Sequence, residues 1–235
     1  MSGSINRIDM KNLFFILLAC LVFPGVVSGA TLEGSIKVGA PFPQSASIEV
    51  KQKPNRNFPD SLNSETLRIS KEGYLKNAVV SVRGDFSQAP GKKKEYVLDQ
   101  KDYRFEPHLI VVPAGEKLRI LNSDPLAHDV RAFDDKAKML FQYDMEVSGG
   151  DALVSFPEPG IYVIRCGLHK WMHAIVVSTP HPYYAVSDEA GGFFLEDVPE
   201  GQYTLEIWHE ALGTKQASID LVDSITDFSY TFKPE

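Results

Sequence analysis

The sequence predicts an all-β protein built from β-sandwiches, and three observations support this prediction. Short runs rich in Val, Ile, Phe and Tyr recur along the chain and alternate with polar residues at the period of two that strands require. Clusters of Gly, Pro, Asn and Asp separate these runs, as turns between strands do. No segment after residue 30 shows a helical period of useful length. The 235 residues are enough for one large or two small domains.

The expected strands are the apolar or alternating runs between these turn signals. In chain order they cover residues 32–38, 47–51, 77–83, 96–99, 108–112, 117–122, 152–156, 161–166, 172–178, 192–195, 203–208 and 216–221. Turns are marked most clearly by the Pro and Gly residues at 113–115, 157–160, 191–192 and 199–201.

The N-terminus has the layout of a secretory signal peptide covering residues 1–30. Arg7 and Lys11 precede an apolar run at 13–23, and the small residues at 28–30 form a cleavage site. The apolar run is too short to span a bilayer, so we expect no membrane span. The mature protein is therefore expected to be periplasmic or otherwise extracytoplasmic.

Cys20 offers a second interpretation of the same segment. Residues 17–20 (LLAC) resemble a lipobox, in which the cysteine becomes a lipid anchor at the mature N-terminus. The apolar residues 21–23 that follow are unlike a lipoprotein tether, which favours simple cleavage.

The charge of the chain bears on its partners. The full sequence has a net charge of −7. Removing residues 1–30, which hold Arg7, Asp9 and Lys11, leaves a net charge of about −8. Such a chain is not expected to bind nucleic acid, since that requires a basic surface. It would suit a protein partner that presents a basic docking surface.

One short stretch, CGLHKWMH at 166–173, concentrates donors that bind soft metals. Without the signal peptide Cys166 is the only cysteine, so it forms no intrachain disulfide and, in an oxidising compartment, must be buried or ligated. His169 and Met172 follow at intervals of three residues. A second imidazole, His128, comes after the expected strand 117–122 and a turn containing proline.

Two imidazoles and one thiolate in a plane, with a distant thioether on the axis, form the ligand set of type 1 copper. We therefore expect one copper ion. Zinc is the chemical competitor, but structural zinc sites rarely use Met, and a catalytic zinc site would normally include a carboxylate or a third histidine.

Taken together, the motifs of residues 95–178 resemble the cupredoxins, the blue copper family that includes plastocyanin and amicyanin. The matching motifs are FEPH at 105–108, VPAG at 112–115, NSD at 122–124, His128, PG at 159–160 and the C-x-x-H-x-x-M spacing of Cys166, His169 and Met172. The resemblance implies a Greek-key β-sandwich in which His128, Cys166 and His169 are equatorial ligands and Met172 is axial. One departure is Asp129, because small blue copper proteins often place Asn there to tie the ligand loops together, and this puts that link in doubt.

The C-terminal segment resembles another β-sandwich family. Residues 184–208 are similar to carboxypeptidase regulatory-like domains of the transthyretin type, which carry no catalytic residues. We divide the mature chain into 31–94, 95–178 and 179–235, with the polar stretch 88–94 as a solvated loop. Because 179–235 is short for a complete sandwich, we expect the strands in 31–94 to complete it, with the copper domain inserted between. The whole order also resembles exported methylamine-utilisation-type cupredoxins.

The remaining histidines are expected to be structural. His108 is interpreted as a hydrogen-bonded structural residue, with an extra metal ligand as the alternative. His173 should point away from the copper and lie at the surface, with partner contact or a second metal as the alternative. His181 is expected in a linker, and His209 at the edge of the last domain's core.

The expected function is that of a one-electron carrier rather than an enzyme. No P-loop, G-x-S-x-G or H-E-x-x-H motif occurs, and Cys166 is flanked by Arg165 and Gly167 where a multicopper enzyme would place a histidine. The expected partner is a redox protein such as a c-type cytochrome or a periplasmic dehydrogenase, which would meet the copper at an exposed edge of His169. The alternatives are copper storage or delivery, and a non-redox binding or structural protein of the cell envelope.

Overall fold

A computed structural model describes residues 29–51, 53–86, 89, 94–145 and 149–233 of the chain. These residues form 18 β-strands and no helix, which confirms the all-β prediction. None of the described segments is a helix with the length and hydropathy that crossing a membrane requires. Residues 1–28 of the expected signal peptide, including Cys20, and most of the loop expected at 88–94 lie outside the described residues.

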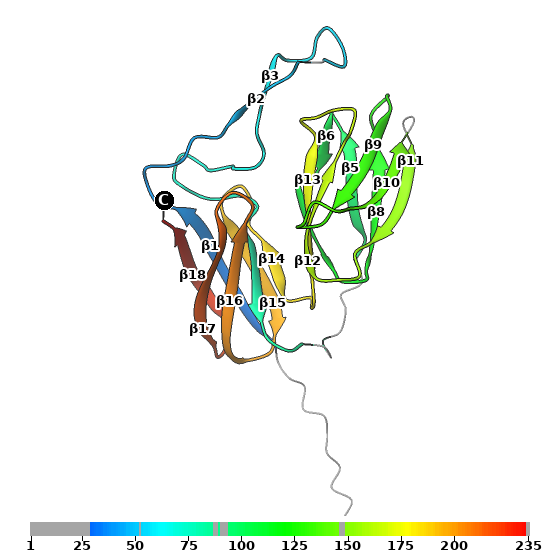
Figure 1. Ribbon diagram of the computed structural model, residues 1–235. Helices are drawn as coiled ribbons and strands as arrows, with labels where there is room; N and C mark the ends of the chain where they lie inside the picture. Colours follow the sequence, from blue (N-terminus) through cyan, green and yellow to red (C-terminus); the bar gives the residue numbers. More distant parts are fainter. Residues whose placement is uncertain (1–28, 52, 87–88, 90–93, 146–148, 234–235) are drawn as a thin grey trace, which may run out of the picture.

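The strands form two β-sandwiches (Figure 1). We call the first one the split sandwich, because both ends of the chain contribute to it. One of its sheets has the order β15 (Gly192–Val198), β1 (Ala30–Val38), β18 (Ile225–Phe232), and the other has the order β14 (Tyr184–Val186), β4 (Val79–Arg83), β16 (Gly201–His209), β17 (Gly213–Leu221).

The second, which we call the inserted sandwich, is built from the middle of the chain. Its sheets have the orders β11 (Gly150–Ser155), β8 (Lys117–Asn122), β5 (Tyr96–Lys101), β6 (Arg104–Glu106) and β10 (Met139–Met145), β9 (His128–Phe133), β12 (Gly160–Arg165), β13 (His173–Thr179), β7 (Leu109–Pro113). A separate hairpin, β2 (Ser47–Glu49) with β3 (Ser61–Asn63), belongs to a long excursion that we call the arm, residues 44–66. Figure 1 shows the arm rising away from the sheets of the split sandwich.

The chain leaves and re-enters the split sandwich through neighbouring strands. β4 and β14 are antiparallel partners, with Ser81 opposite Tyr184 and Val79 opposite Val186. The whole inserted sandwich therefore occupies the connection between two paired strands. Since paired strands lie about 5 Å apart, this connection leaves the sheet of the split sandwich intact.

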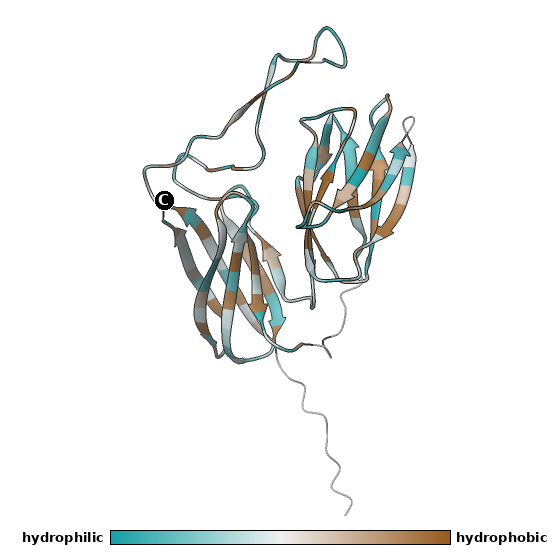
Figure 2. Cartoon of the chain, viewed as in Figure 1, coloured by the Kyte–Doolittle hydropathy of each residue, from teal (hydrophilic) through white to brown (hydrophobic). Residues whose placement is uncertain are grey.

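Bands of hydrophobic and hydrophilic residues follow one another along the strands (Figure 2), and successive side chains of a strand point to opposite faces. Each sandwich has a core of its own, and a third apolar cluster lies between the two. The split core includes Leu32, Ile36, Val80, Val82, Leu195, Leu205, Ile207 and Phe232; the inserted core includes Leu98, Phe105, Leu118, Ile120, Phe156 and Ile164. The interface cluster joins Val79, Tyr184, Val186 and Trp208 of the split sandwich to Leu109, Val111, Ile175 and Val177 of the inserted one.

Six of the observed strands were not predicted from the sequence: β3, β6, β9, β10, β14 and β18. Three of these have only three residues each, and several residues of β10 and β18 are exposed. β18 nevertheless has an alternating apolar face, with Phe228, Tyr230 and Phe232 packed in or against the split core. β9 matters most for the site, because His128 is its first residue. His128 follows β8 and the turn containing proline, as expected, and it opens a strand that was not predicted.

We predict that a fragment of residues 179–235 does not fold alone. It would lack β1 and β4, which pair with β15, β16 and β18, and its apolar faces would stay exposed. Urea titration followed by far-ultraviolet circular dichroism should show a gradual, non-cooperative change, whereas the full mature chain should show a sigmoidal transition. A sigmoidal transition of the fragment would contradict the prediction.

We also predict that His181 makes the protein less stable at acid pH. It is buried in the connection to β14, where its Nδ1 accepts a hydrogen bond from the Tyr183 N–H at 3.2 Å, and burial lowers its pKa. The unfolded chain binds this proton near the ordinary value of about 6.5, so stability falls as the pH drops below that value. In His181→Asn, which keeps an acceptor, the loss of unfolding free energy between about pH 7.5 and about pH 5.5 should be smaller than in the wild type. Equal losses in both proteins would rule out this role.

Candidate metal centre

Three of the residues singled out from the sequence meet at one end of the inserted sandwich. His128 begins β9, Cys166 follows β12, and His169 lies in the turn between β12 and β13. The turn closes through hydrogen bonds from the Cys166 N–H to the Met172 carbonyl and from the Met172 N–H to the His169 carbonyl. β9 and β12 are hydrogen-bonded neighbours, which brings His128 to the same sheet end as the turn.

The donor atoms are close enough for one metal ion to touch all three. Cys166 Sγ lies 3.7 Å from His128 Nδ1 and 3.6 Å from His169 Nδ1, and the two Nδ1 atoms are 3.0 Å apart. Metal–nitrogen bonds of about 2.0–2.1 Å and metal–sulfur bonds of about 2.3 Å would span each of these separations. Both histidines turn the same nitrogen toward the centre, so the residues fit an ion in geometry as well as in donor type.

Met172 lies beside this group but in the turn, one residue before the strand that we expected it to open. Its side chain is 2% exposed and packs in the inserted core with Cys166. A methionine held in an apolar core is the kind of weak donor that an axial position of copper uses. The His128, Cys166, His169 and Met172 side chains thus form one buried group.

Asp124 fixes the orientation of His128, a role that the sequence analysis did not assign. The His128 Nε2–H donates to Asp124 Oδ2 at 2.8 Å, which leaves Nδ1 free to face the centre. The same buried carboxylate accepts hydrogen bonds from the N–H groups of Asp102 and Tyr103 at 2.8 and 3.0 Å. A carboxylate in this position selects the tautomer and raises the basicity of a ligating imidazole. The signal was present in the sequence as an Asp four residues before the first ligand.

Asp129 links the two ligand segments, where the resemblance had put such a link in doubt. Its carboxylate accepts a hydrogen bond from the Gly167 N–H, directly after Cys166, and from Arg131 Nε at 2.9 Å. Arg131 also forms an ion pair with it at 2.6 Å, which balances the buried charge. A Cβ on Gly167 would lie 2.3 Å from the guanidinium carbon of Arg131, so a larger residue there would displace this side chain. An aspartate–arginine pair therefore connects these segments.

The surroundings favour the neutral forms of the Cys166 and His169 side chains. Burial raises the pKa of the Cys166 thiol, although the backbone N–H groups of Asp129, His169 and Leu168 favour the thiolate. Burial, together with the nearby His128, lowers the pKa of His169. A metal ion would displace the proton of the Cys166 thiol, so uptake would release protons.

The expectation of an exposed His169 edge was wrong. The His169 side chain is covered by Trp171, whose ring centroid lies 5.2 Å away, and by Tyr103 at 5.8 Å, and only 9% of the residue is exposed. Phe58 of the arm packs against both aromatic rings, at 5.5 and 4.8 Å. Leu168 and Lys170 of the same turn remain exposed. The arm, more than a hundred residues earlier in the sequence, therefore helps to cover His169.

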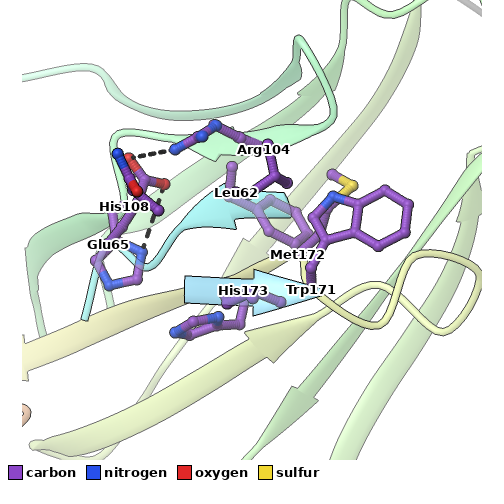
Figure 3. A pocket seen from close by; sticks show the side chains of 10 residues that line it. Leu62, Glu65, Arg104, His108, Trp171, Met172 and His173 are labelled. Atoms are coloured by element: carbon purple, nitrogen blue, oxygen red, sulfur yellow. Dashed lines mark ion pairs between the residues drawn. The ribbon is translucent and has the colours of Figure 1, made fainter. Parts of the chain in front are cut away.

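His173 is half-buried rather than at the surface, where it was expected. It lies on the face of β13 opposite Ala174 and Val176, turned away from the ligand group and toward the split sandwich. His108 is buried next to it, with ring centroids 4.9 Å apart, and its Nε2 lies 2.5 Å from Oε1 of Glu210. His108 is therefore hydrogen-bonded, as the structural interpretation expected. Figure 3 shows both imidazoles side by side.

The last two histidines are buried in the split sandwich or its connection. His209 ends β16 and is fully buried, and its Nδ1 accepts a hydrogen bond from the Ala211 N–H at 3.2 Å. Burial lowers its pKa to about 4. His181 packs edge-on against Phe86 within the connecting segment. Neither belongs to the donor groups found among the described residues.

No protein-family model and no curated protein matches the sequence. Solved structures that are similar include cupredoxins. A purple cupredoxin from Nitrosopumilus maritimus is 18% identical over 36% of this chain and all of its own, with a TM-score of 0.32. Amicyanin from Paracoccus versutus is 18% identical over 43% of this chain and 97% of its own (TM-score 0.33), and an amicyanin mutant in the Cu(I) form is 19% identical over 43% and 98% (TM-score 0.34).

We predict that Asp124→Asn weakens metal binding about 10- to 100-fold, because the amide supports the His128 tautomer less well than the carboxylate does. Competition titration of Cu2+ or Co2+ against a chelator would measure the loss. Asp99→Asn is the matched control, since that carboxylate holds Ser123 in the same loop without touching a ligand. Equal affinity of Asp124→Asn and Asp99→Asn would show that Asp124 does not tune the site.

Proposed function

We propose that this protein binds one type 1 copper ion through His128, Cys166, His169 and Met172 and acts as a one-electron carrier. The observation that carries the proposal is the convergence of two imidazole Nδ1 atoms and one thiol sulfur within 3.7 Å of one another among buried side chains. Thiolate and thioether suit Cu(I), imidazole suits Cu(II), and this set serves both oxidation states. Copper would supply the redox chemistry, and the protein would hold the ligands.

The chain's own contribution would be to hold the ligands in place and to exclude water. Asp124 fixes His128, and Asp129 fixes the segment that carries Cys166. Trp171 and Tyr103 cover His169. Ligands that are held by packing and hydrogen bonds need not rearrange when the charge of the ion changes, which favours rapid electron transfer.

The rim around Trp171 is the proposed contact surface for a redox partner. Leu168 is 55% exposed and Lys170 is exposed, and both flank the covered His169. An apolar contact with a polar edge suits a brief encounter with another redox protein, such as a c-type cytochrome or a periplasmic dehydrogenase. We propose an extracytoplasmic location for this exchange, in keeping with the expected signal peptide.

The purified mature protein, titrated with Cu2+, tests the proposal. We expect an intense thiolate-to-copper absorption band and narrow copper hyperfine splitting in the EPR spectrum at one equivalent. Cys166→Ala should lose the band, because the thiolate is the source of the transition. Leu168→Ala, in the same turn but exposed, should keep it and serves as the matched control.

Two outcomes would contradict the proposal. A colourless protein that binds zinc at these residues would assign them a structural role. A coloured site that gives up copper rapidly to a chelator, with slow electron self-exchange, would favour storage or delivery.

A further inference from the structure

A second group of metal-binding side chains lies between the two sandwiches, separate from the proposed copper ligands. His108 and His173 come from the inserted sandwich, and Glu210 from the hairpin between β16 and β17 of the split sandwich. One donor atom of each lies within 4.8 Å of the other two. The Glu210 carboxylate bridges the pair, with Oε1 at 2.5 Å from His108 Nε2 and Oε2 at 3.9 Å from His173 Nε2.

The charges around this group favour a cation. The side chain of Glu210 is 10% exposed, and a second carboxylate, Glu65 of the arm, lies 3.9 Å from Nδ1 of His108. Arg104 pairs with Glu65 at 3.2 Å (Figure 3). The ion-pair partners of Glu210 are the two histidines, so its negative charge is balanced only when they carry a positive charge or bind a cation. A buried carboxylate that faces two imidazoles is stabilised when a positive charge joins them.

Room for a further ligand is present beside the imidazoles. His108 and His173 line a cavity of about 20 Å3 together with Glu65 and Arg104, seen in Figure 3. A single water molecule needs about 10–15 Å3. The Nδ1 atom of His108 is buried without a hydrogen-bond partner among the described residues, so this nitrogen is available to a ligand that enters the cavity.

We infer that His108, His173 and Glu210 form a second metal site that takes a divalent transition-metal ion of the Zn2+ class and joins the two sandwiches. Two imidazoles, one carboxylate and a water complete the four-coordinate arrangement that Zn2+ adopts. The ion replaces the hydrogen bond between His108 and Glu210. Neither sandwich supplies the whole site, so the ion binds only when the two are docked.

The site differs in chemistry from the neighbouring thiolate group. It contains no sulfur donor among its three members, and its ligands come from both sandwiches. Oxygen and imidazole donors suit a redox-inactive ion, whereas the thiolate group suits copper. Met172 and His173 are adjacent in sequence, so the two groups lie on opposite sides of one strand end.

Zinc binding in the mature double variant Cys166→Ala, His169→Ala, which lacks two donors of the other group, tests the inference. Calorimetric titration with Zn2+ should still detect one equivalent. Adding Glu210→Gln should weaken that binding by at least about 10- to 100-fold, because a ligand is lost while the hydrogen-bond acceptor is kept. Glu206→Gln, in β16 just before that hairpin and in an exposed pair with Arg83, is the matched control and should bind zinc normally.

Thermal unfolding provides the second readout. Zn2+ should raise the melting temperature of the double variant and leave that of its Glu210→Gln form unchanged, since a ligand that binds only the folded state stabilises it. If the Glu210→Gln form folds poorly, His108→Gln replaces it in this test, and Zn2+ should likewise leave its melting temperature unchanged. The inference fails if no zinc binds, or if Glu210→Gln and Glu206→Gln bind it equally. Because Cys166 is absent throughout, these results do not depend on whether the wild-type protein binds copper.

Discussion

The two-residue alternation along β13 is the constraint on which the arrangement of this protein depends. Ala174 and Val176 face the core of the inserted sandwich, and Ile175 and Val177 face the apolar cluster between the sandwiches. A strand buried on both faces can serve two cores at once. For the same reason Met172, just before β13, and His173, its first residue, point in opposite directions. Met172 packs in the inserted core with Cys166, and His173 faces Glu210 of the split sandwich.

Polar groups outside the proposed ligand set hold the segments that carry His128 and Cys166 in position. Asp124 and Asp129 each place a buried carboxylate where it receives several hydrogen bonds, and Arg131 balances one of the two charges. Buried carboxylates are costly unless they are paired in this way. The pocket is therefore held by a network whose members depend on one another, and the loss of one member would alter the others.

Much of this could be predicted from the sequence because it depends on local patterns. Period-two alternation and turn residues gave the fold class, and the spacing of Cys166, His169 and Met172 placed three donors in one turn. The cover over His169 could not be predicted, since Phe58 reaches it from more than a hundred residues away. The position of His173 was missed for a related reason: alternation gives the face of a strand, but it does not say whether that face meets water or another sandwich.

The pairing of β4 with β14 affects which insertions such a chain can accept during evolution. The chain enters and leaves the inserted sandwich at adjacent positions in one sheet, as it would at the two ends of a hairpin loop. Insertions are tolerated best where the two ends of a module lie close together. The split sandwich can therefore act as a constant frame in which the module between β4 and β14 is lengthened, replaced or retuned, provided that the apolar cluster beneath it is preserved.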